Sequence, residues 1–235
     1  MLTTIRRDIQ VARQRDPANP TALEVVFCYP GVHAVWGHRI SHWLWRRGLR
    51  LIARALAEVT RILTGVDIHP GATLRHGLFI DHATGVVIGE TAEVGEDVTI
   101  FHGVTLGGTG RDRGKRHPTV GDRVIIGAGA KILGPIKLGD DSRIGANSVV
   151  VKEVPASAVV VGVPGQVVSH PGPAGEDESR LPDLVGVSLK SLLTRVARLE
   201  SRDPATRNGS QGVAGSDRVI RPPEAGVWHG EDFSI

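Results

Sequence analysis

The chain has 235 residues, enough to bury a sizeable hydrophobic core in one or two domains. Its single cysteine, Cys28, excludes an intramolecular disulfide and a metal site built from several cysteines, and it favours a reducing, cytoplasmic location. The small net charge of +3 with scattered arginines argues against a nucleic-acid partner, and the charged N-terminus and interrupted apolar runs argue against a signal peptide or a membrane span.

Residues 1–64 are expected to form an N-terminal helical cap. The pattern predicts a first helix over 6–15 ended by Asp16-Pro17, a second from Pro30-Gly31 to Gly48, and a third over 49–62. The second helix should place four apolar side chains near one face, namely Val35, Ile40, Trp43 and Leu44.

From residue 66 to residue 161 the chain repeats with a period of six. The repeating aliphatic positions are Val120, Ile126, Ile132, Leu138, Ile144 and Val150, and upstream Ile68, Leu74, Ile80 and Val86, followed after a two-residue shift by Ile88, Val94, Ile100 and Leu106. A helix has a period of 3.6 and a half-buried strand a period of 2, so neither explains this pattern. Three hexapeptides fit one triangular turn of a solenoid whose aliphatic side chains point inward.

The fold class expected for residues 65–168 is therefore mainly β: a left-handed parallel β-helix of hexapeptide repeats, with the helical cap at its N-terminus. This handedness is an exception to the usual rule for crossover connections. The domain boundaries that follow are 1–64 for the cap, 65–168 for the β-helix and 169–235 for a C-terminal segment.

A loop over residues 107–118 interrupts the repeat, because fourteen positions separate Leu106 from Val120 where six or twelve are expected. The loop carries five basic side chains or histidines: Arg111, Arg113, Lys115, Arg116 and His117. One interpretation is a solvated basic loop. The other is a flap that binds an anion, since its glycines allow backbone N–H groups to approach a ligand.

Residues 169–235 begin with a linker rich in proline, glycine and charge. A short amphipathic helix is expected next, with one apolar face suited to packing on a neighbouring subunit and made of Leu189, Leu192, Val196 and Leu199. A flexible tail is expected after it, ending in VWHGEDFSI.

Several motifs in order along residues 16–168 resemble the serine O-acetyltransferases, most closely their short actinobacterial members. They are GVDIHPGA, IDHATGVVIGET, VTLGGTG, KRHPTVGD, IIGAGAKILG, IGANSVVVKEVP and GVPGQVV. The resemblance implies an acyltransferase that moves the acetyl group of acetyl-CoA to the hydroxyl of L-serine, the first step of cysteine biosynthesis. Acetyl-CoA is then a co-substrate, and no metal is expected.

The resemblance also implies residue roles. His82 matches the general base and Asp67 the carboxylate that orients it. Four positions match contacts to the amino acid, namely Asp16, Asp81, Arg116 and His117. Four positions match the coenzyme A groove, namely Gly108, Thr109, Ala128 and Ala146.

Physical chemistry makes these roles reasonable. A neutral serine hydroxyl is a poor nucleophile, so transfer of an acetyl group to it needs a base. When that base is an imidazole, a carboxylate on the far ring nitrogen fixes its tautomer. A zwitterion needs an anion for its ammonium group and a cation for its carboxylate. No serine or cysteine is placed beside His82 to be acylated, which predicts direct transfer in a ternary complex.

The expected assembly is a homotrimer with acetyl-CoA bound at subunit boundaries, with a hexamer possible. Cysteine differs from serine only in sulfur for oxygen, so L-cysteine is expected to occupy the serine site as a feedback inhibitor. The tail ending in Ile235 resembles the family's docking peptide for O-acetylserine sulfhydrylase.

Three alternatives remain at this stage. One is a hexapeptide acetyltransferase for a sugar or a xenobiotic, and another is a structural solenoid without activity. The third is a trimeric zinc hydratase similar to the γ-carbonic anhydrases, because histidines are available at His69, His76, His82, His102 and His117. His69 and His76 are expected on the surface or at an interface, whereas His102 could face the same groove as His82.

Overall fold

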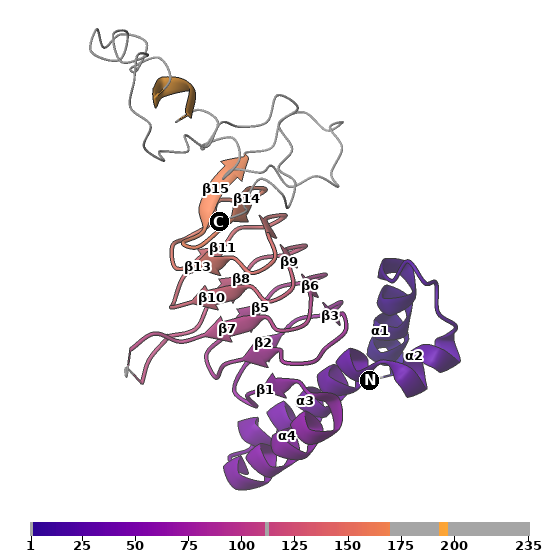
Figure 1. Ribbon diagram of the computed structural model, residues 1–235. Helices are drawn as coiled ribbons and strands as arrows, with labels where there is room; N and C mark the ends of the chain where they lie inside the picture. Colours follow the sequence, from indigo (N-terminus) through magenta and orange to yellow (C-terminus); the bar gives the residue numbers. More distant parts are fainter. Residues whose placement is uncertain (1, 111–112, 170–192, 197–235) are drawn as a thin grey trace, which may run out of the picture. The chain divides into compact units, whose positions relative to one another are not determined.

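A computed structural model of the chain describes residues 2–110, 113–169 and 193–196 (Figure 1). Contacts between residues divide the chain into two compact units, 1–182 and 183–235. The first unit begins with four helices in its described part: α1 (Leu2–Arg15), α2 (Ala22–Cys28), α3 (Pro30–Arg46) and α4 (Arg50–Thr64). In the second unit the described residues, 193–196, form one helical turn. The predicted helix positions Leu189, Leu192 and Leu199 and the tail residue Ile235 lie outside the described residues.

The helical cap differs from the prediction at two points. Helix α2 was not predicted, although Thr21 and Glu24 form a capping box in which each side chain accepts a hydrogen bond from the other's backbone N–H. Of the four apolar side chains expected near one face of α3, only Val35 is buried, and Ile40 and Trp43 are exposed in the single chain. The buried residues of α3 are Gly31, Val32, Ala34, Val35, His38 and Ser41.

Short strands after the cap wind into a parallel β-helix with three flat sides, each side a sheet made of every third strand (Figure 1). The first sheet contains β1 (Asp67–Ile68), β4 (Val87–Ile88), β7 (Thr105–Gly107), β10 (Lys131–Leu133) and β13 (Val149–Val150). The second contains β2 (Thr73–Leu74), β5 (Glu93–Val94), β8 (Thr119–Val120) and β11 (Lys137–Leu138). The third contains β3 (Phe79–Ile80), β6 (Thr99–Ile100), β9 (Ile125–Ile126), β12 (Arg143–Ile144), β14 (Val159–Val161) and the antiparallel β15 (Gln166–Ser169).

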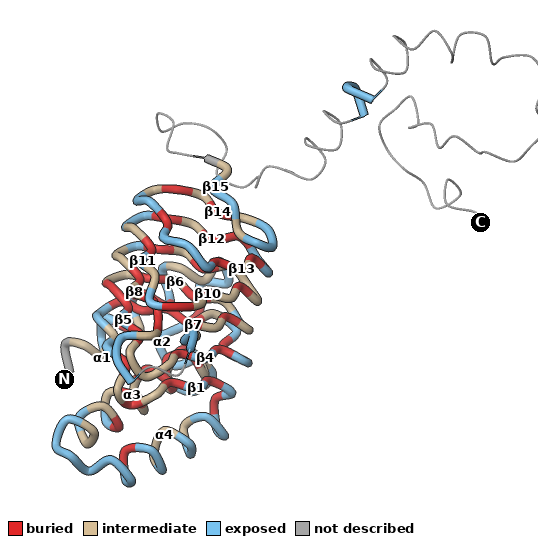
Figure 2. Tube along the Cα trace, turned by 90° about the vertical axis from the view of Figure 1, so that its left-hand side faces the viewer, coloured by how far each residue is buried: buried red, intermediate tan, exposed pale blue. Residues whose placement is uncertain are grey.

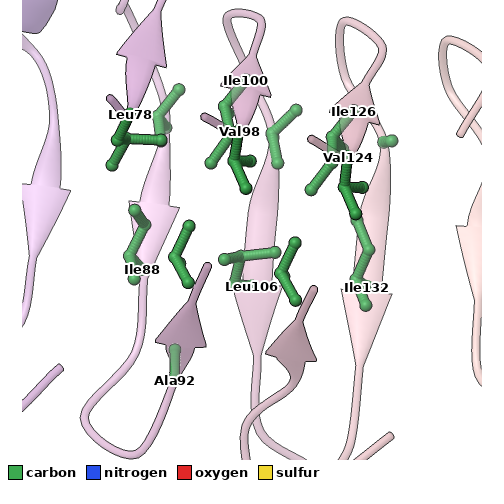
Figure 3. Packing of buried hydrophobic residues seen from close by; sticks show 14 of the residues in the cluster. Leu78, Ile88, Ala92, Val98, Ile100, Leu106, Val124, Ile126 and Ile132 are labelled. Atoms are coloured by element: carbon green, nitrogen blue, oxygen red, sulfur yellow. The ribbon is translucent and has the colours of Figure 1, made fainter. Parts of the chain in front are cut away.

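The core is a stack of aliphatic side chains inside the coil. Buried residues recur at regular intervals along every turn (Figure 2). Each side contributes two inward positions two residues apart, such as Val98 with Ile100 and Val124 with Ile126 (Figure 3). Burying one such side chain stabilises the fold by about 1.5–3 kcal/mol. The hexapeptide prediction is confirmed. Apart from Val86, which was predicted, the inward position two residues before each repeating position is an addition to it.

The register of the strands accounts for both breaks in the period. Ile88 pairs with Leu106, 18 positions later, which is one regular turn. Ile80 pairs with Ile100, 20 positions later, so the turn between Ile80 and Ile88 contains two extra residues. Leu106 pairs with Ile132, 26 positions later, so the loop over 107–118 adds eight. Both insertions lie at corners, outside the ladder of backbone hydrogen bonds.

The cap contacts the first turn of the β-helix through α1 and α3, both of which lie against β3. A Cβ atom on Gly31 would lie 2.0 Å from the carbonyl oxygen of Ile80, so only glycine allows α3 to approach this closely. From the end of α1, Arg15 donates to the carbonyl oxygens of Asp97 and Val98 at 2.8 and 3.1 Å. These contacts hold the end of α1 against the start of the third sheet.

One buried histidine of the cap makes a testable prediction about stability. His38 is 5% exposed. Burial is the main cause that lowers the pKa of His38 to about 3. The charges of His42, Arg39 and His69 lower this pKa further, whereas the backbone of Ala72 raises it. Below pH 6.5 the unfolded chain therefore binds a proton at this residue that the folded chain does not. The free energy of unfolding should therefore decrease as the pH is lowered, by up to about 1.4 kcal/mol per pH unit from this residue alone.

Chemical denaturation between pH 4 and pH 7, about the range in which the linkage acts, measures this slope. His38→Leu should show the shallower slope at equal protein concentration, whereas replacing the exposed His76 by leucine should leave the slope unchanged. Equal slopes for the parent and His38→Leu would contradict the prediction.

None of the helices within the described residues is both long and apolar enough to cross a membrane.

Candidate active site

The turns from the third sheet to the first form a continuous edge, here called the histidine corner (residues 81–86, 101–104, 127–130 and 145–148). Backbone N–H groups of one turn donate to carbonyl oxygens of the turn below: Gly103 to Thr84, Gly129 to His102 and Asn147 to Ala128. Successive turns are therefore about 4.8 Å apart along this edge. The histidine corner holds five residues singled out above, namely Asp81, His82, His102, Ala128 and Ala146.

The two extra residues of the first turn change the backbone of this corner. Gly85, Gly103, Gly129 and Asn147 occupy a left-handed position that recurs at the corner, with φ between 55° and 77°. His82 and Ala83 add two further left-handed residues, with φ of 55° and 53°. For a non-glycine residue this conformation costs about 1–2 kcal/mol. The longer turn projects the His82 side chain outward, where it is 74% exposed.

His82 lies beside a carboxylate and a second imidazole. The backbone N–H of His82 donates to Oδ1 of Asp81 at 3.0 Å, and Nε2 of its ring lies 4.0 Å from Oδ2 of Asp81. The His102 ring packs edge-on against the His82 ring, with 5.7 Å between centroids and 90° between planes. His102 thus faces the same corner as His82.

Asp16 reaches the same corner from the end of α1. Its Oδ1 accepts the backbone N–H of Ala18 at 2.8 Å, and its Oδ2 accepts the hydroxyl of Tyr29. These two hydrogen bonds, with a smaller contribution from the His82 charge, lower the pKa of Asp16. Asp16 is thus an anion close to His82. The sequence analysis missed Tyr29, because nothing in the sequence pairs it with Asp16.

Asp67 lies on the exposed, outer side of β1 in the first sheet. Among the described residues, the structure gives no hydrogen bond between Asp67 and His82, and the carboxylate next to His82 is that of Asp81. The single chain therefore does not bring the predicted base and its predicted orienting group into contact.

A second group of predicted residues occupies the edge between the first and second sheets, here called the loop corner (residues 89–92, 108–118 and 134–136). Thr91 holds the loop there. Its hydroxyl oxygen accepts the backbone N–H groups of Arg116 and His117, both at 3.1 Å. Its carbonyl oxygen accepts from Nζ of Lys115 at 2.8 Å, and that ammonium also pairs with Glu93.

The predicted ligand side chains of this corner already have partners in the single chain. Arg116 forms an ion pair with Glu90, which lowers the pKa of the Glu90 carboxyl. His117 is 8% exposed, and its Nδ1 accepts the backbone N–H of Thr91 at 3.2 Å. Burial first, and then the Arg116 charge, lower the pKa of His117, so its ring is neutral. The sequence analysis missed Glu90 and Thr91, although the segment GET (residues 89–91) lies at the turn directly below the loop.

Glycines and Thr109 complete the loop corner. A Cβ on Gly89 would lie 2.0 Å from the His117 ring, and one on Gly108 would lie 3.2 Å from its Nε2, so the ring fits only beside bare backbone. Thr109 lies against Gly134, which stands one turn above the start of the loop. Arg111 lies outside the described residues.

The structure thus sorts the predicted site residues into two groups on different edges of one prism. The histidine corner holds His82, Asp81, Asp16, Ala128 and Ala146, and the loop corner holds Arg116, His117, Gly108 and Thr109. The first sheet separates the two corners, with Asp67 on its outer side. Within the residues described, no group of three His, Cys, Asp or Glu side chains lies close enough to hold a metal ion.

Comparisons with known proteins bear on the fold and the family of the chain. Residues 117–152 match the family model described as bacterial transferase hexapeptide, six repeats. Fold and repeat together define a transferase of the left-handed β-helix class. The serine acetyltransferase of Mycobacterium tuberculosis is 74% identical over 237 residues, covering the whole of both chains. The chain belongs to the serine acetyltransferase family.

Three solved structures are similar to the chain. One is the Neisseria gonorrhoeae serine acetyltransferase in complex with serine, 45% identical with a TM-score of 0.69, covering 72% of this chain and 69% of that one. Another is the Brucella abortus enzyme in complex with coenzyme A, 47% identical with a TM-score of 0.71 over 73% and 68% of the two chains. The third, a serine acetyltransferase in complex with cysteine, is 46% identical with a TM-score of 0.70 over 72% and 70%.

Proposed function

We propose that the chain transfers the acetyl group of acetyl-CoA to the hydroxyl of L-serine, giving O-acetyl-L-serine and coenzyme A, with His82 as the general base. The observation that carries this is the histidine corner, where an exposed imidazole on a lengthened turn lies beside the Asp81 carboxylate and within range of the charge of Asp16. Relatives solved with serine and with coenzyme A support the two substrates. These supports favour serine acetylation over a sugar or xenobiotic acceptor and over a zinc hydratase.

His82 removes the proton of the serine hydroxyl as that oxygen attacks the thioester carbonyl carbon. The C–S bond then breaks, and the thiolate of coenzyme A takes the proton back from the imidazolium. The acetyl group moves directly from sulfur to oxygen without an acyl-enzyme. We propose Asp67 as the group that orients His82 during this transfer, by resemblance to the family. Asp81 already accepts the backbone N–H of His82, so it holds the turn and contributes negative charge for the substrate ammonium group.

The amino acid binds as a zwitterion. Asp16 and Asp81 supply negative charge for its ammonium group at the histidine corner. Arg116 supplies positive charge for its carboxylate, with His117 beside it, and a planar guanidinium suits a carboxylate especially well. Arg116 pairs with Glu90 in the single chain, so the substrate carboxylate must compete with Glu90 or share the guanidinium with it.

The active site is composite, formed by two subunits of a trimer. Arg116 and His82 lie on different corners of one chain, and no motion within a packed coil brings two corners together. Three parallel β-helices around a threefold axis would place the loop corner of one subunit against the histidine corner of the next. Coenzyme A would then bind between subunits, against Ala128 and Ala146 of one and Gly108 and Thr109 of the other. Pairing of two trimers into a hexamer stays a prediction.

Three further assignments complete the proposal. L-cysteine competes with L-serine for the same site as a feedback inhibitor, which the cysteine complex of a relative supports. The C-terminal Ile235 docks into O-acetylserine sulfhydrylase, by resemblance alone. The cytoplasmic location stays a prediction based on the single cysteine.

A thiol-release assay tests the proposed activity. The purified chain with acetyl-CoA should release coenzyme A rapidly with L-serine, and at least about a hundredfold more slowly with L-homoserine, sugars or amines, because those acceptors misplace the hydroxyl or lack the zwitterion. Higher activity with a sugar or an amine than with L-serine would overturn the proposal.

A further inference from the structure

Asp16 is held by hydrogen bonds at both of its carboxylate oxygens. The Ala18 backbone N–H donates to Oδ1 at 2.8 Å, and the Tyr29 hydroxyl donates to Oδ2. The first contact is local and restrains the turn after α1. The second joins two separate segments of the cap, because Tyr29 is the N-cap residue of α3. The Tyr29 bond therefore determines how the Asp16 side chain is aimed relative to the rest of the cap.

The hydroxyl of Tyr29 is itself well fixed. Its ring packs against an apolar cluster that joins the cap to β3, made of Val11, Ala12, Val25, Val32 and Phe79. Its carbonyl oxygen accepts the backbone N–H of Val32 at 3.1 Å, within the first turn of α3. The ring of Tyr29 is held by this cluster and its hydroxyl bonds to Asp16, so Tyr29 can fix the position of the Asp16 carboxylate relative to the β-helix.

The charges around Tyr29 favour the donor form of its hydroxyl. Burial raises the pKa of Tyr29, and the hydrogen bond to Asp16 and the charges of Asp16, Asp81 and Glu24 raise it further. The same hydrogen bond is the largest cause of the lowered pKa of Asp16. Tyr29 thus remains a neutral phenol while Asp16 remains a carboxylate, the form that receives an ammonium group.

We propose that Tyr29 is a positioning residue for the amino-acid substrate, whose hydroxyl holds the Asp16 carboxylate in the orientation that receives the ammonium group of serine. The inference rests on the proposed function of Asp16. Tyr29 acts through Asp16 and does not touch the reacting atoms. Its loss should therefore weaken serine binding in the ground state and the transition state alike.

Tyr29→Phe removes the hydroxyl and keeps the packed ring. The KM for L-serine should rise about tenfold, near the low end of what a hydrogen bond to a charged group contributes. The inhibition constant of L-cysteine should rise in parallel if both amino acids use Asp16. The kcat and the KM for acetyl-CoA should stay within about twofold of the parent, the pattern of lost uniform binding.

Trp36→Phe is the matched control. Nε1 of Trp36 donates to Oδ2 of Asp8 at 2.9 Å, and Trp36 packs against the same apolar cluster as Tyr29, but Asp8 is not a site residue. This variant should leave the KM for serine unchanged. In an Asp16→Asn background, Tyr29→Phe should cause little further change, because the contact that it removes is already altered.

Tyr29 is the only tyrosine of the chain, so its ionisation can be followed by phenolate absorbance. Asp16→Asn should lower the pKa of Tyr29, because it removes the negative charge that disfavours the phenolate. This shift would show that the hydrogen bond forms in solution, and the KM for L-serine then shows whether the bond positions Asp16.

The outcomes separate the inference from the function on which it rests. If Asp16→Asn raises the KM for serine and Tyr29→Phe does not, the positioning role is wrong and the role of Asp16 stands. If neither variant changes that KM, the role of Asp16 is wrong as well. An equal rise in Trp36→Phe, or a parallel rise in the KM for acetyl-CoA, would mean a general loss of structure and would overturn the inference.

Discussion

Replacing His82 by alanine should lower kcat for serine acetylation by about 10²–10⁴-fold, the usual contribution of a positioned general base. The fold should survive the change, because the His82 side chain is 74% exposed and is not part of the buried core. Alanine at this position keeps the backbone strain as it is and removes only the imidazole. Steady-state thiol release at saturating serine and acetyl-CoA measures the loss, and circular dichroism checks the fold.

Three variants make the result specific. His76→Ala removes an exposed imidazole from another corner of the same turn and should leave kcat unchanged. Asp67→Asn should lower kcat if Asp67 orients the base, whereas Asp81→Asn should mainly raise the KM for serine. A loss of kcat in Asp81→Asn alone would transfer the orienting role to Asp81, the carboxylate nearest to the ring. Activity of His82→Ala within a few-fold of the parent would remove His82 from the mechanism.

A mixture of two inactive variants should recover about one quarter of the parental activity if the site is shared between subunits. The two variants are His82→Ala and Arg116→Ala. They are mixed in equal amounts and refolded together. Each site then needs an intact His82 from one subunit and an intact Arg116 from the next, and half of the subunits supply each. Each variant alone should have almost no activity, so the activity recovered in the mixture is easy to detect.

The control mixture pairs His82→Ala with Asp16→Ala. Both side chains are assigned to the same subunit's part of the site, so no arrangement of these subunits completes a site, and the mixture should show no activity beyond that of the Asp16→Ala subunits alone. Recovery in this control, or none in the first mixture, would show that His82 and Arg116 are not contributed by neighbouring subunits.

Much of the fold could be predicted from the sequence because a solenoid is built from local repeats. The aliphatic positions from Ile68 to Val150 determine which side chains point inward, and the structure confirms them. The cap is harder to predict, because its helices pack by tertiary contacts. Ile40 and Trp43 have the spacing of a buried face, yet α3 buries the small residues around Ala34 and His38 instead.

The candidate site was predictable to the extent that motifs mark it. DHATG and the loop over 107–118 located the two groups of residues, but their assignment to different corners needed the exact length of the insertions. Contacts between distant segments were beyond reach. The bond from Tyr29 to Asp16 depends on how α3 docks. The pair of Arg116 with Glu90 spans 26 positions, in a turn that the loop lengthens by eight residues.

The two extra residues of the DHATG turn have a wider consequence for how such a chain can change. An insertion within a side of the coil would turn every later side chain to the opposite face, so the sides tolerate no change of length. A corner can take up added length where the extra residues stay outside the core, as the exposed His82 does although its neighbour Ala83 is buried. New functional residues in this architecture are therefore expected in insertions at the corners. Breaks in the hexapeptide period of such a sequence are the first places to look for catalytic or binding residues.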